Sequence, residues 1–181
     1  TQWSDASGAA RKVVSPVSLI VSAFASLPDV RGTLTPQLDA QREDTTLVLI
    51  DLGRGRHRLG GSVLAQALGQ SGCPVADGVP DLDDAPDLKN LVAAVNQLRA
   101  EGTLLAYHDR SDGGLWATVC EMAFAGHLGV SLNVDILVTE GDGISDSRAE
   151  MGDSKNWATQ VSERRNELTL KALFNEELGV V

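Results

Sequence analysis

Hydrophobic residues follow two different spacings along the chain, and these predict both strands and helices. The segments 13–24 and 46–51 are apolar runs rich in Val, Ile and Leu, which predict strands. The second run is continuous and bounded by polar residues, as is typical of a strand buried on both faces. Between residues 87 and 100, apolar residues recur at helical spacing, which predicts an amphipathic helix.

Shorter patterns complete the predicted fold. Ser62 is a good N-cap for a helix that ends near Gly69. Two further helices are expected over 115–125 and 168–175, and three short strands over 104–107, 129–136 and 178–181. Strands and helices alternate without the strict rhythm of a doubly wound sheet. The predicted fold class is therefore α+β, a mixed β-sheet with packed helices.

Two segments lack these patterns. Residues 1–12 are small and polar, so we expect a frayed terminus. Residues 139–165 are polar, contain a Gly-Asp-Gly run and show no periodicity, which favours a flexible insertion.

Composition narrows the function classes. The chain has 181 residues, of which 43% are hydrophobic, so it is long and apolar enough to form a globular core. Its net charge of −10 argues against nucleic-acid partners and against anionic membrane surfaces. There is no apolar run long enough for a membrane span. Cys73 and Cys120 have no metal-ligand spacing, which suggests reduced thiols and a cytoplasmic location.

The glycine-rich loop over 53–61 is one candidate binding site. It carries Arg54, Arg56 and Arg58 and leads into the predicted helix after Ser62. Free N–H groups at a helix start favour anions, and the arginines would add to that preference. The alternative, which we favour, is a solvated loop whose glycines serve the turn geometry.

The segment 108–114, His-Asp-Arg-Ser-Asp-Gly-Gly, is the densest polar cluster. It lies between a predicted strand and a predicted helix, where open sheets place ligand sites. Asp109 and Asp112 could hold a hard cation, and Ser111 could bond a phosphate oxygen. Equally, Asp112 could cap the following helix while the glycines shape the turn. For His108 we expect a hydrogen-bonded structural role rather than a role as a base.

These motifs resemble the large, glutamine-dependent form of phosphoribosylformylglycinamidine synthase. The strongest resemblance lies in Tyr107-His-Asp-Arg-Ser-Asp-Gly-Gly114 and in Glu121-Met-Ala-Phe-Ala-Gly-His127. Further similar motifs, in the same order along the chain, are Ser15-Pro-Val-Ser-Leu19, Thr33-Leu-Thr-Pro-Gln-Leu38, Leu49-Ile-Asp-Leu-Gly53, Leu59-Gly-Gly-Ser62 and Phe174-Asn-Glu-Glu-Leu-Gly179. The resemblance covers most of the chain outside residues 137–166.

The resemblance implies a fold and a domain order. Residues 1–28 would end a nucleotide-binding subdomain, and 29–44 would be a linker. Residues 45–181 would form the C-terminal subdomain of the aminoimidazole ribonucleotide synthetase type, incomplete at its C-terminus and carrying the insertion 139–165. The rest of the parent chain, with a first synthetase-like half and a glutaminase domain, would be the partner. A missing strand would leave an open sheet edge, so we expect a homodimer of the fragment through that edge.

The resemblance also implies a reaction and a site. The family amidates formylglycinamide ribonucleotide in purine biosynthesis, using ATP and glutamine, and the fragment alone would be inactive. Asp109 matches the family's magnesium-binding aspartate, and Ser111 matches its nucleotide-contacting serine. Both would belong to an auxiliary site where Mg²⁺ and ATP or ADP are bound but not turned over.

Two alternatives remain open. The first is another ATP-dependent enzyme of the same superfamily, either a kinase or a synthetase of the selenophosphate type. The second is a non-catalytic interaction module that keeps the fold with a vacant cleft. Such a module would not need Asp109 and Ser111 to face a cleft.

Overall fold

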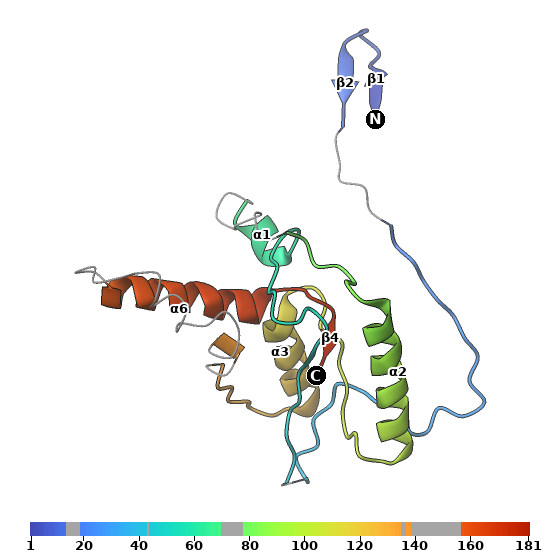
Figure 1. The fold of residues 1–181 in the computed structure, drawn as a ribbon. Coiled ribbons are helices and arrows are strands. Elements are labelled where there is room, and N and C mark those ends of the chain that lie inside the picture. Colours follow the sequence, from blue (N-terminus) through green and yellow to red (C-terminus); the bar gives the residue numbers. More distant parts are fainter. Residues whose placement is uncertain (14–18, 43, 70–77, 135–136, 139–156) are drawn as a thin grey trace. The chain divides into compact units, whose positions relative to one another are not determined.

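The computed structural model describes residues 1–13, 19–42, 44–69, 78–134, 137–138 and 157–181, and of 157–163 it describes the backbone only. The chain divides into two compact units, Thr1–Arg31 and Gly32–Val181. Figure 1 shows the helices and strands of both units. Among the residues so described, no helix is long and apolar enough to cross a membrane.

The first unit begins with a β-hairpin. Strands β1 (Gln2–Ser4) and β2 (Ala10–Lys12) pair antiparallel. Asp5 stabilises the turn, because its carboxylate accepts hydrogen bonds from the Ser7 hydroxyl and from Arg11 Nε, at 2.5 and 2.8 Å. These two bonds lower the pKa of Asp5 to about 2. The expectation of a frayed terminus over residues 1–12 is therefore wrong, because a side-chain network closes the turn.

The strand predicted over 13–24 is not present in its described part. Residues 14–18 lie outside the described residues, and 19–24 are not in a strand. The side chains of Leu19, Ile20 and Phe24 are 86%, 91% and 95% exposed. A strand needs a hydrogen-bonding partner, and residues 19–24 form no backbone hydrogen bond within the described part of the chain.

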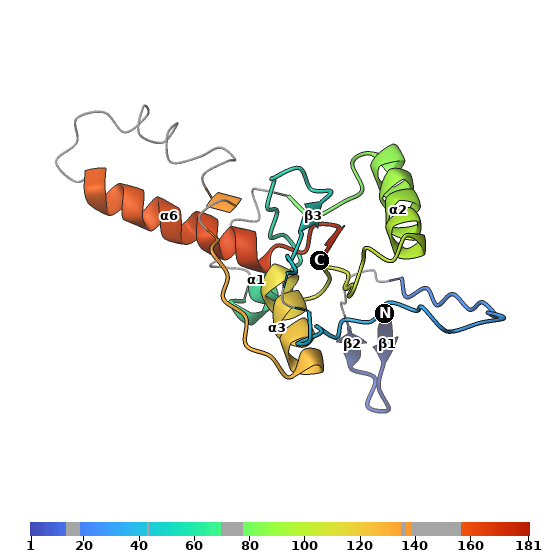
Figure 2. The same ribbon diagram turned by 90° about the horizontal axis from the view of Figure 1, so that it is seen from below.

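The second unit contains the predicted helices. They are α1 (Val63–Ala67), α2 (Ala85–Ala100), α3 (Gly114–Gly126) and α6 (Trp157–Phe174), seen from below in Figure 2. The N-cap role predicted for Ser62 is confirmed, because its hydroxyl accepts the Ala65 N–H at 3.2 Å. The helices predicted over 87–100 and 115–125 are confirmed to within two residues at each end.

Helix α6 is longer than the predicted helix over 168–175. It starts at Trp157, so the flexible insertion predicted over 139–165 is wrong for 157–165, and 139–156 lies outside the described residues. The helix is polar, with ion pairs in place of an apolar stripe. Glu167 pairs with Arg164 and Lys171, one turn away on either side, at 3.2 and 3.1 Å.

The sheet of this unit is small. Strands β3 (Ile50–Asp51) and β4 (Gly179–Val180) pair antiparallel, and Asp109 forms a bridge to Val180 on the other edge of β4. The strand predicted over 178–181 is confirmed. Only the last two residues of the run 46–51 form a strand. Their pairing partner, β4, is also only two residues long, so the pairing cannot extend further.

Three further points about the predicted strands need correction: the burial of the run 46–51, and the strands expected over 104–107 and 129–136. The run 46–51 is not buried on both faces, since Leu47 and Val48 are 36% and 60% exposed. Residues 104–107 are not in a strand, because pairing with the C-terminal segment begins only at His108. Residues 129–134 are not in a strand, and 135–136 lie outside the described residues. The expected mixed sheet is thus reduced to a short antiparallel core.

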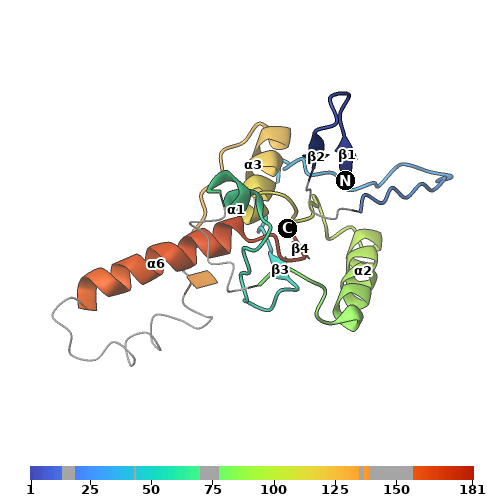
Figure 3. The ribbon, with the colours of Figure 1, turned by 90° about the horizontal axis from the view of Figure 1, so that it is seen from above.

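The hydrophobic core lies where α1, α3 and α6 meet. Met122 of α3 is fully buried, and α3 packs against α6. The rings of Trp116 and Phe174 lie with centroids 6.4 Å apart. Phe174 also packs against buried Leu59 and Ala65, so the end of α6 meets α1, as seen from above in Figure 3. This core supports the segment that follows α6.

Candidate functional site

The predicted polar cluster forms a loop that we call the site loop, residues 108–113. Its first half runs antiparallel to the C-terminal segment. The backbones of His108 and Val181 exchange two hydrogen bonds, at 2.9 and 2.8 Å, and the Arg110 N–H donates to Gly179 O at 2.8 Å. The loop is therefore an extra edge of the small sheet, beside β4.

Extended backbone sends successive side chains to opposite faces, and the site loop follows this rule. The side chain of Arg110 is 1% exposed, whereas that of Asp109 is 69% exposed, and Ser111 is also exposed. Asp109 and Ser111, the two predicted site residues, therefore lie on the solvent side of one loop. The Ser111 hydroxyl has no hydrogen-bond partner among the described residues.

Arg110 anchors the loop on its buried side, opposite to the two predicted site residues. Its guanidinium donates to the carbonyl oxygens of Glu177 and Leu178, at 2.6 and 3.1 Å, and pairs with the Asp51 carboxylate. Burial acts to raise the pKa of Asp51. Hydrogen bonds from the Gly55 N–H and from Arg110 outweigh that effect, so the pKa lies below its ordinary value.

The second half of the site loop turns into α3. Gly113 and Gly114 have φ angles of 84° and 66°, so the turn uses backbone conformations that favour glycine, as predicted. The proposed capping by Asp112 is wrong: Gly113 is the N-cap, and its N–H donates to Glu176 Oε1 at 2.9 Å. The same oxygen accepts the N–H of Val63 at 2.8 Å, so one carboxylate serves the starts of α1 and α3.

His108 is held between two carboxylates. Its Nε2 lies 2.7 Å from Glu121 Oε2, and its Nδ1 lies 3.5 Å from Asp109 Oδ1. The hydrogen-bonded role predicted for His108 is confirmed. Glu121 comes from α3, one of the elements that support the loop.

A groove of about 490 Å³ opens beside the site loop. Asp109 borders it, whereas Ser111 does not. Its walls are mostly apolar and come from α2 and from the β4 region, including Leu88, Leu91, Val92, Val95, Tyr107, Leu178 and Val180. Grooves of this size, apolar with a few polar groups at the edge, are typical of small-molecule sites.

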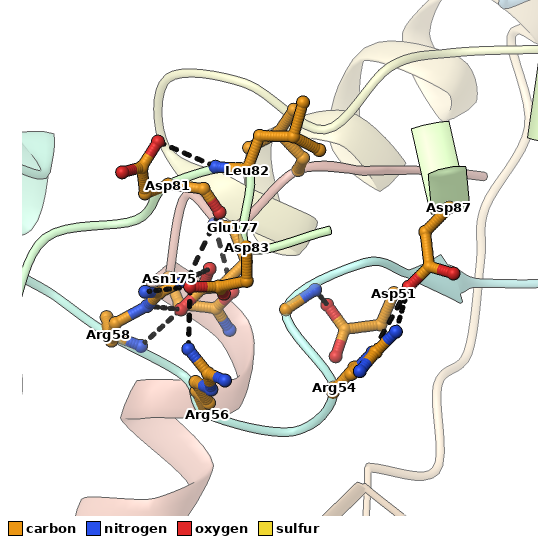
Figure 4. Close-up of polar contacts among 12 residues, drawn as sticks. Asp51, Arg54, Arg56, Arg58, Asp81, Leu82, Asp83, Asp87, Asn175 and Glu177 are labelled. Carbon is orange, nitrogen blue, oxygen red and sulfur yellow. Dashed lines mark hydrogen bonds and ion pairs between the residues drawn. The ribbon is translucent and has the colours of Figure 1, made fainter. Parts of the chain in front are cut away.

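The glycine-rich loop over 53–61 is not an anion site. Arg54 pairs with Asp84 and Asp87, and Arg56 pairs with Asp83. Figure 4 shows Arg54 beside Asp87 and Arg56 beside Asp83. Helix α1, which follows, has only five residues. The positive charge of the loop is therefore paired within the chain. Gly55 and Gly61 have positive φ angles, as expected if glycines serve the turn geometry, but the loop is not solvated throughout, because Arg58 to Gly60 are buried.

Arg58 forms the buried part of this network. Its Nε lies 2.6 Å from Oε1 of Glu177, whose side chain is fully buried, and its Nη2 lies 2.8 Å from Asp83. The hydrogen bond to Glu177 raises the pKa of Arg58 above its ordinary value, and the bond from Arg58 lowers the pKa of Asp83. The network joins the loop 53–61, the acidic segment 81–87 and the segment after α6.

Sequence reasoning missed Asp51, Glu176 and Glu177 as supports of the site. The side-chain hydrogen bonds that join these three residues to the site or its supports span 59 to 119 residues along the chain. Their other side-chain hydrogen bonds are within local turns. A signal was present in the unequal charge distribution, with three arginines in 53–61 and four acidic residues in 81–87. Such a distribution suggests pairing but cannot assign partners.

The site loop can supply part of a magnesium site. Mg²⁺ in nucleotide sites uses one or two carboxylates together with phosphate oxygens and water. Asp109 offers an exposed carboxylate of this kind. No group of three His, Cys, Asp or Glu side chains that could hold an ion occurs in the part of the chain that the structure describes. The donor set therefore fits an ion shared with a phosphate, and it does not fit an ion held by the protein alone.

The fold and site define an α+β domain with an exposed acidic loop beside an apolar groove. Residues 42–181 match the family of AIR synthase related proteins over its C-terminal domain. Because the match covers more than half of the chain, the protein belongs to this family. Its superfamily consists of ATP-dependent enzymes that typically use Mg²⁺.

Proposed function

We propose that this chain is part of a phosphoribosylformylglycinamidine synthase of the large, glutamine-dependent form. That enzyme amidates formylglycinamide ribonucleotide with nitrogen from glutamine and energy from ATP. In this proposal the chain contributes an auxiliary Mg²⁺–nucleotide site, and the first synthetase-like half and the glutaminase domain are its partners. In this proposal the 181 residues alone are inactive, because the reaction also needs the glutaminase domain.

One observation carries the proposal. Asp109 and Ser111 lie on the exposed side of a loop whose other side is anchored. Within the described part of the chain, the Asp109 carboxylate forms one ion pair, with His108 at 3.5 Å, and Asp109 borders the apolar groove. This supports Asp109 as a magnesium ligand and Ser111 as a nucleotide contact, in line with the motif they share with that enzyme family.

Charge explains why the metal would be required. The chain carries a net charge of −10, and the arginines of the loop 53–61 and of the site loop are paired with acidic residues: Arg54, Arg56, Arg58 and Arg110. A bound cation would offset the repulsion between the phosphates and Asp109. Nucleotide binding should therefore depend on Mg²⁺.

Calorimetric titration of the 181-residue chain with ADP tests the proposal. We expect binding in Mg²⁺ and none in EDTA. Asp109→Asn should weaken Mg–ADP binding by about tenfold or more, because it removes a charged ligand. Asp39→Asn is the matched control, since it removes a carboxylate outside the groove and should change the affinity less than about twofold.

The outcomes separate the alternatives. A chain that binds no Mg–ADP would fit a non-catalytic interaction module instead. In the complete protein, ATP hydrolysis should require formylglycinamide ribonucleotide together with glutamine or ammonia. Hydrolysis without a nitrogen donor would instead indicate a kinase or another synthetase of the superfamily.

A further inference from the structure

Arg110 is the buried residue of the site loop. Its side chain is 1% exposed, although it carries a charge and lies between two exposed neighbours, Asp109 and Ser111. Its acidic partner, Asp51, is only about one-fifth exposed. The pair therefore lies largely out of water.

Fold stability alone does not account for such a pair. Removing two charges from water costs about as much as their attraction returns, and apolar residues of similar volume often serve stability equally well. What an arginine adds is a planar fork of donors with fixed directions. Here the fork satisfies two backbone carbonyls and one carboxylate at once.

The three acceptors lie on different parts of the sheet. Asp51 belongs to β3, whereas the carbonyls of Glu177 and Leu178 belong to the segment that enters β4. The Arg110 backbone itself is bonded to Gly179 O at 2.8 Å. One residue thus fixes the site loop to both strands.

We propose that Arg110, together with Asp51, is the positioning residue for the Mg²⁺–nucleotide site. Because Arg110 is held inward, the residues on either side of it are held outward. The guanidinium thereby sets the place of the Asp109 carboxylate and the Ser111 hydroxyl, and Arg110 itself lines the groove next to Asp109. This inference rests on the function proposed above.

The test measures ADP affinity and the Mg²⁺ concentration for half-saturation, at a temperature where circular dichroism shows every variant folded. Arg110→Met should weaken Mg–ADP binding by about tenfold or more and raise the Mg²⁺ requirement. Arg110→Lys should bind more tightly than Arg110→Met, because an ammonium can still pair with Asp51. Loss of fold stability alone would change neither quantity in a fully folded sample.

Arg58→Met is the matched control. Arg58 is also a buried arginine paired with an acid, and its side chain is 11% exposed, yet none of its described contacts is with the site loop. Arg58 binds the carboxylate of Glu177, whereas Arg110 binds the backbone carbonyl of the same residue. Arg58→Met should lower the melting temperature, because it leaves the buried carboxylate unpaired, while Arg110 keeps its three acceptors and the ADP affinity stays within about twofold. Equal losses of affinity in Arg58→Met and Arg110→Met would overturn the positioning role.

Asp51→Asn keeps the test decisive if Arg110→Met does not fold. It leaves the guanidinium its two carbonyl partners. It removes the charge that orients the guanidinium and one of the two oxygens that accept from Arg110, Gly53 and Gly55, so it should also weaken Mg–ADP binding. Unchanged affinity in folded Arg110→Met, or in Asp51→Asn, would overturn this inference alone. A wild-type chain that binds no Mg–ADP would overturn the proposed function and this inference together.

Discussion

His57 lies where a charged imidazole is unfavourable. It is half-buried, and the side-chain nitrogen Nδ2 of Asn175 lies 3.1 Å from its Nδ1. Since an amide nitrogen donates, the ring must accept through an unprotonated Nδ1. Burial lowers the pKa of His57 below 6.5; nearby Asp51 and Glu177 act to raise it and Arg110 to lower it.

This environment predicts a pH dependence of stability. The folded pKa lies below the unfolded value, so the unfolded chain binds more protons as the pH falls past about 6.5. The free energy of unfolding should therefore decrease from pH 7 toward pH 5. His57→Asn should reduce this decrease, as measured by urea denaturation at each pH.

His127→Asn is the control for that experiment. His127 has nearly the same left-handed backbone, with φ of 54° against 52° for His57, but it is exposed. The control should keep the wild-type pH dependence. If both variants keep it, His57 is not the group responsible.

At the scale of single residues, the sequence motif predicted those site residues whose side chains are exposed to solvent. Asp109 and Ser111 were identified from the sequence, and both are exposed. Glu176 was not identified from the sequence. One of its oxygens accepts backbone N–H groups at the starts of two helices, α1 and α3, and these come together only in the folded chain. The partners of Arg110 and Arg58 could not be predicted for the same reason.

At the scale of elements, Gly114 is the point where α3 meets the end of α6. A Cβ at Gly114 would lie 2.5 Å from Asn175 O and 2.7 Å from Leu173 O. Both contacts are with backbone, which cannot move aside as a side chain can. The close approach of α3 to the segment after α6 therefore requires glycine.

Gly114→Ala should destabilise the chain by about 3 kcal/mol or more, because a backbone clash adds to the strain of a positive φ. Gly61→Ala is the matched control, since Gly61 also has a positive φ, of 77°, but nothing within 4 Å of its Cβ position. It should cost only about 1–2 kcal/mol. Denaturant unfolding measures both values, and equal costs would show that the clash is absent.

The same scale shows why helices were predicted more accurately than strands. The apolar spacing of α2 and the caps of α1 are local signals, and both helices form where expected. Strands need a neighbour to bond with. The segment 129–134 has the alternating pattern of a strand, but it is not a strand, and no strand of the described part of the chain pairs with it.

At the scale of the whole molecule, the run 46–49 is an open apolar edge. No backbone hydrogen bond is formed by these residues within the described part of the chain, and Val48 is 60% exposed. In an antiparallel pairing centred on Val48, a second copy would place Thr46 opposite Ile50 and no two like charges opposite each other. An unpaired edge of this kind favours association with another strand.

We therefore expect the chain to dimerise through this edge. Light scattering after size-exclusion chromatography should show a dimer fraction that rises with protein concentration. It should also rise with salt, which screens the repulsion between copies of net charge −10. Val48→Lys should leave a monomer, whereas Leu170→Lys, at an exposed position of α6, should not. A monomeric wild type at all concentrations would contradict this prediction.

The sequence by itself determined the α+β character, the positions of α1, α2 and α3 and the loop that carries Asp109 and Ser111, because each depends on local spacing, capping or a short motif. Tertiary structure decided which strands pair, since pairing needs a neighbour that is distant in the chain. It also decided that the arginines of 53–61 are neutralised by the segment 81–87, so that no anion site remains there. Finally, it buried Arg110 against Asp51 and so turned Asp109 outward, because an extended backbone directs neighbouring side chains to opposite faces.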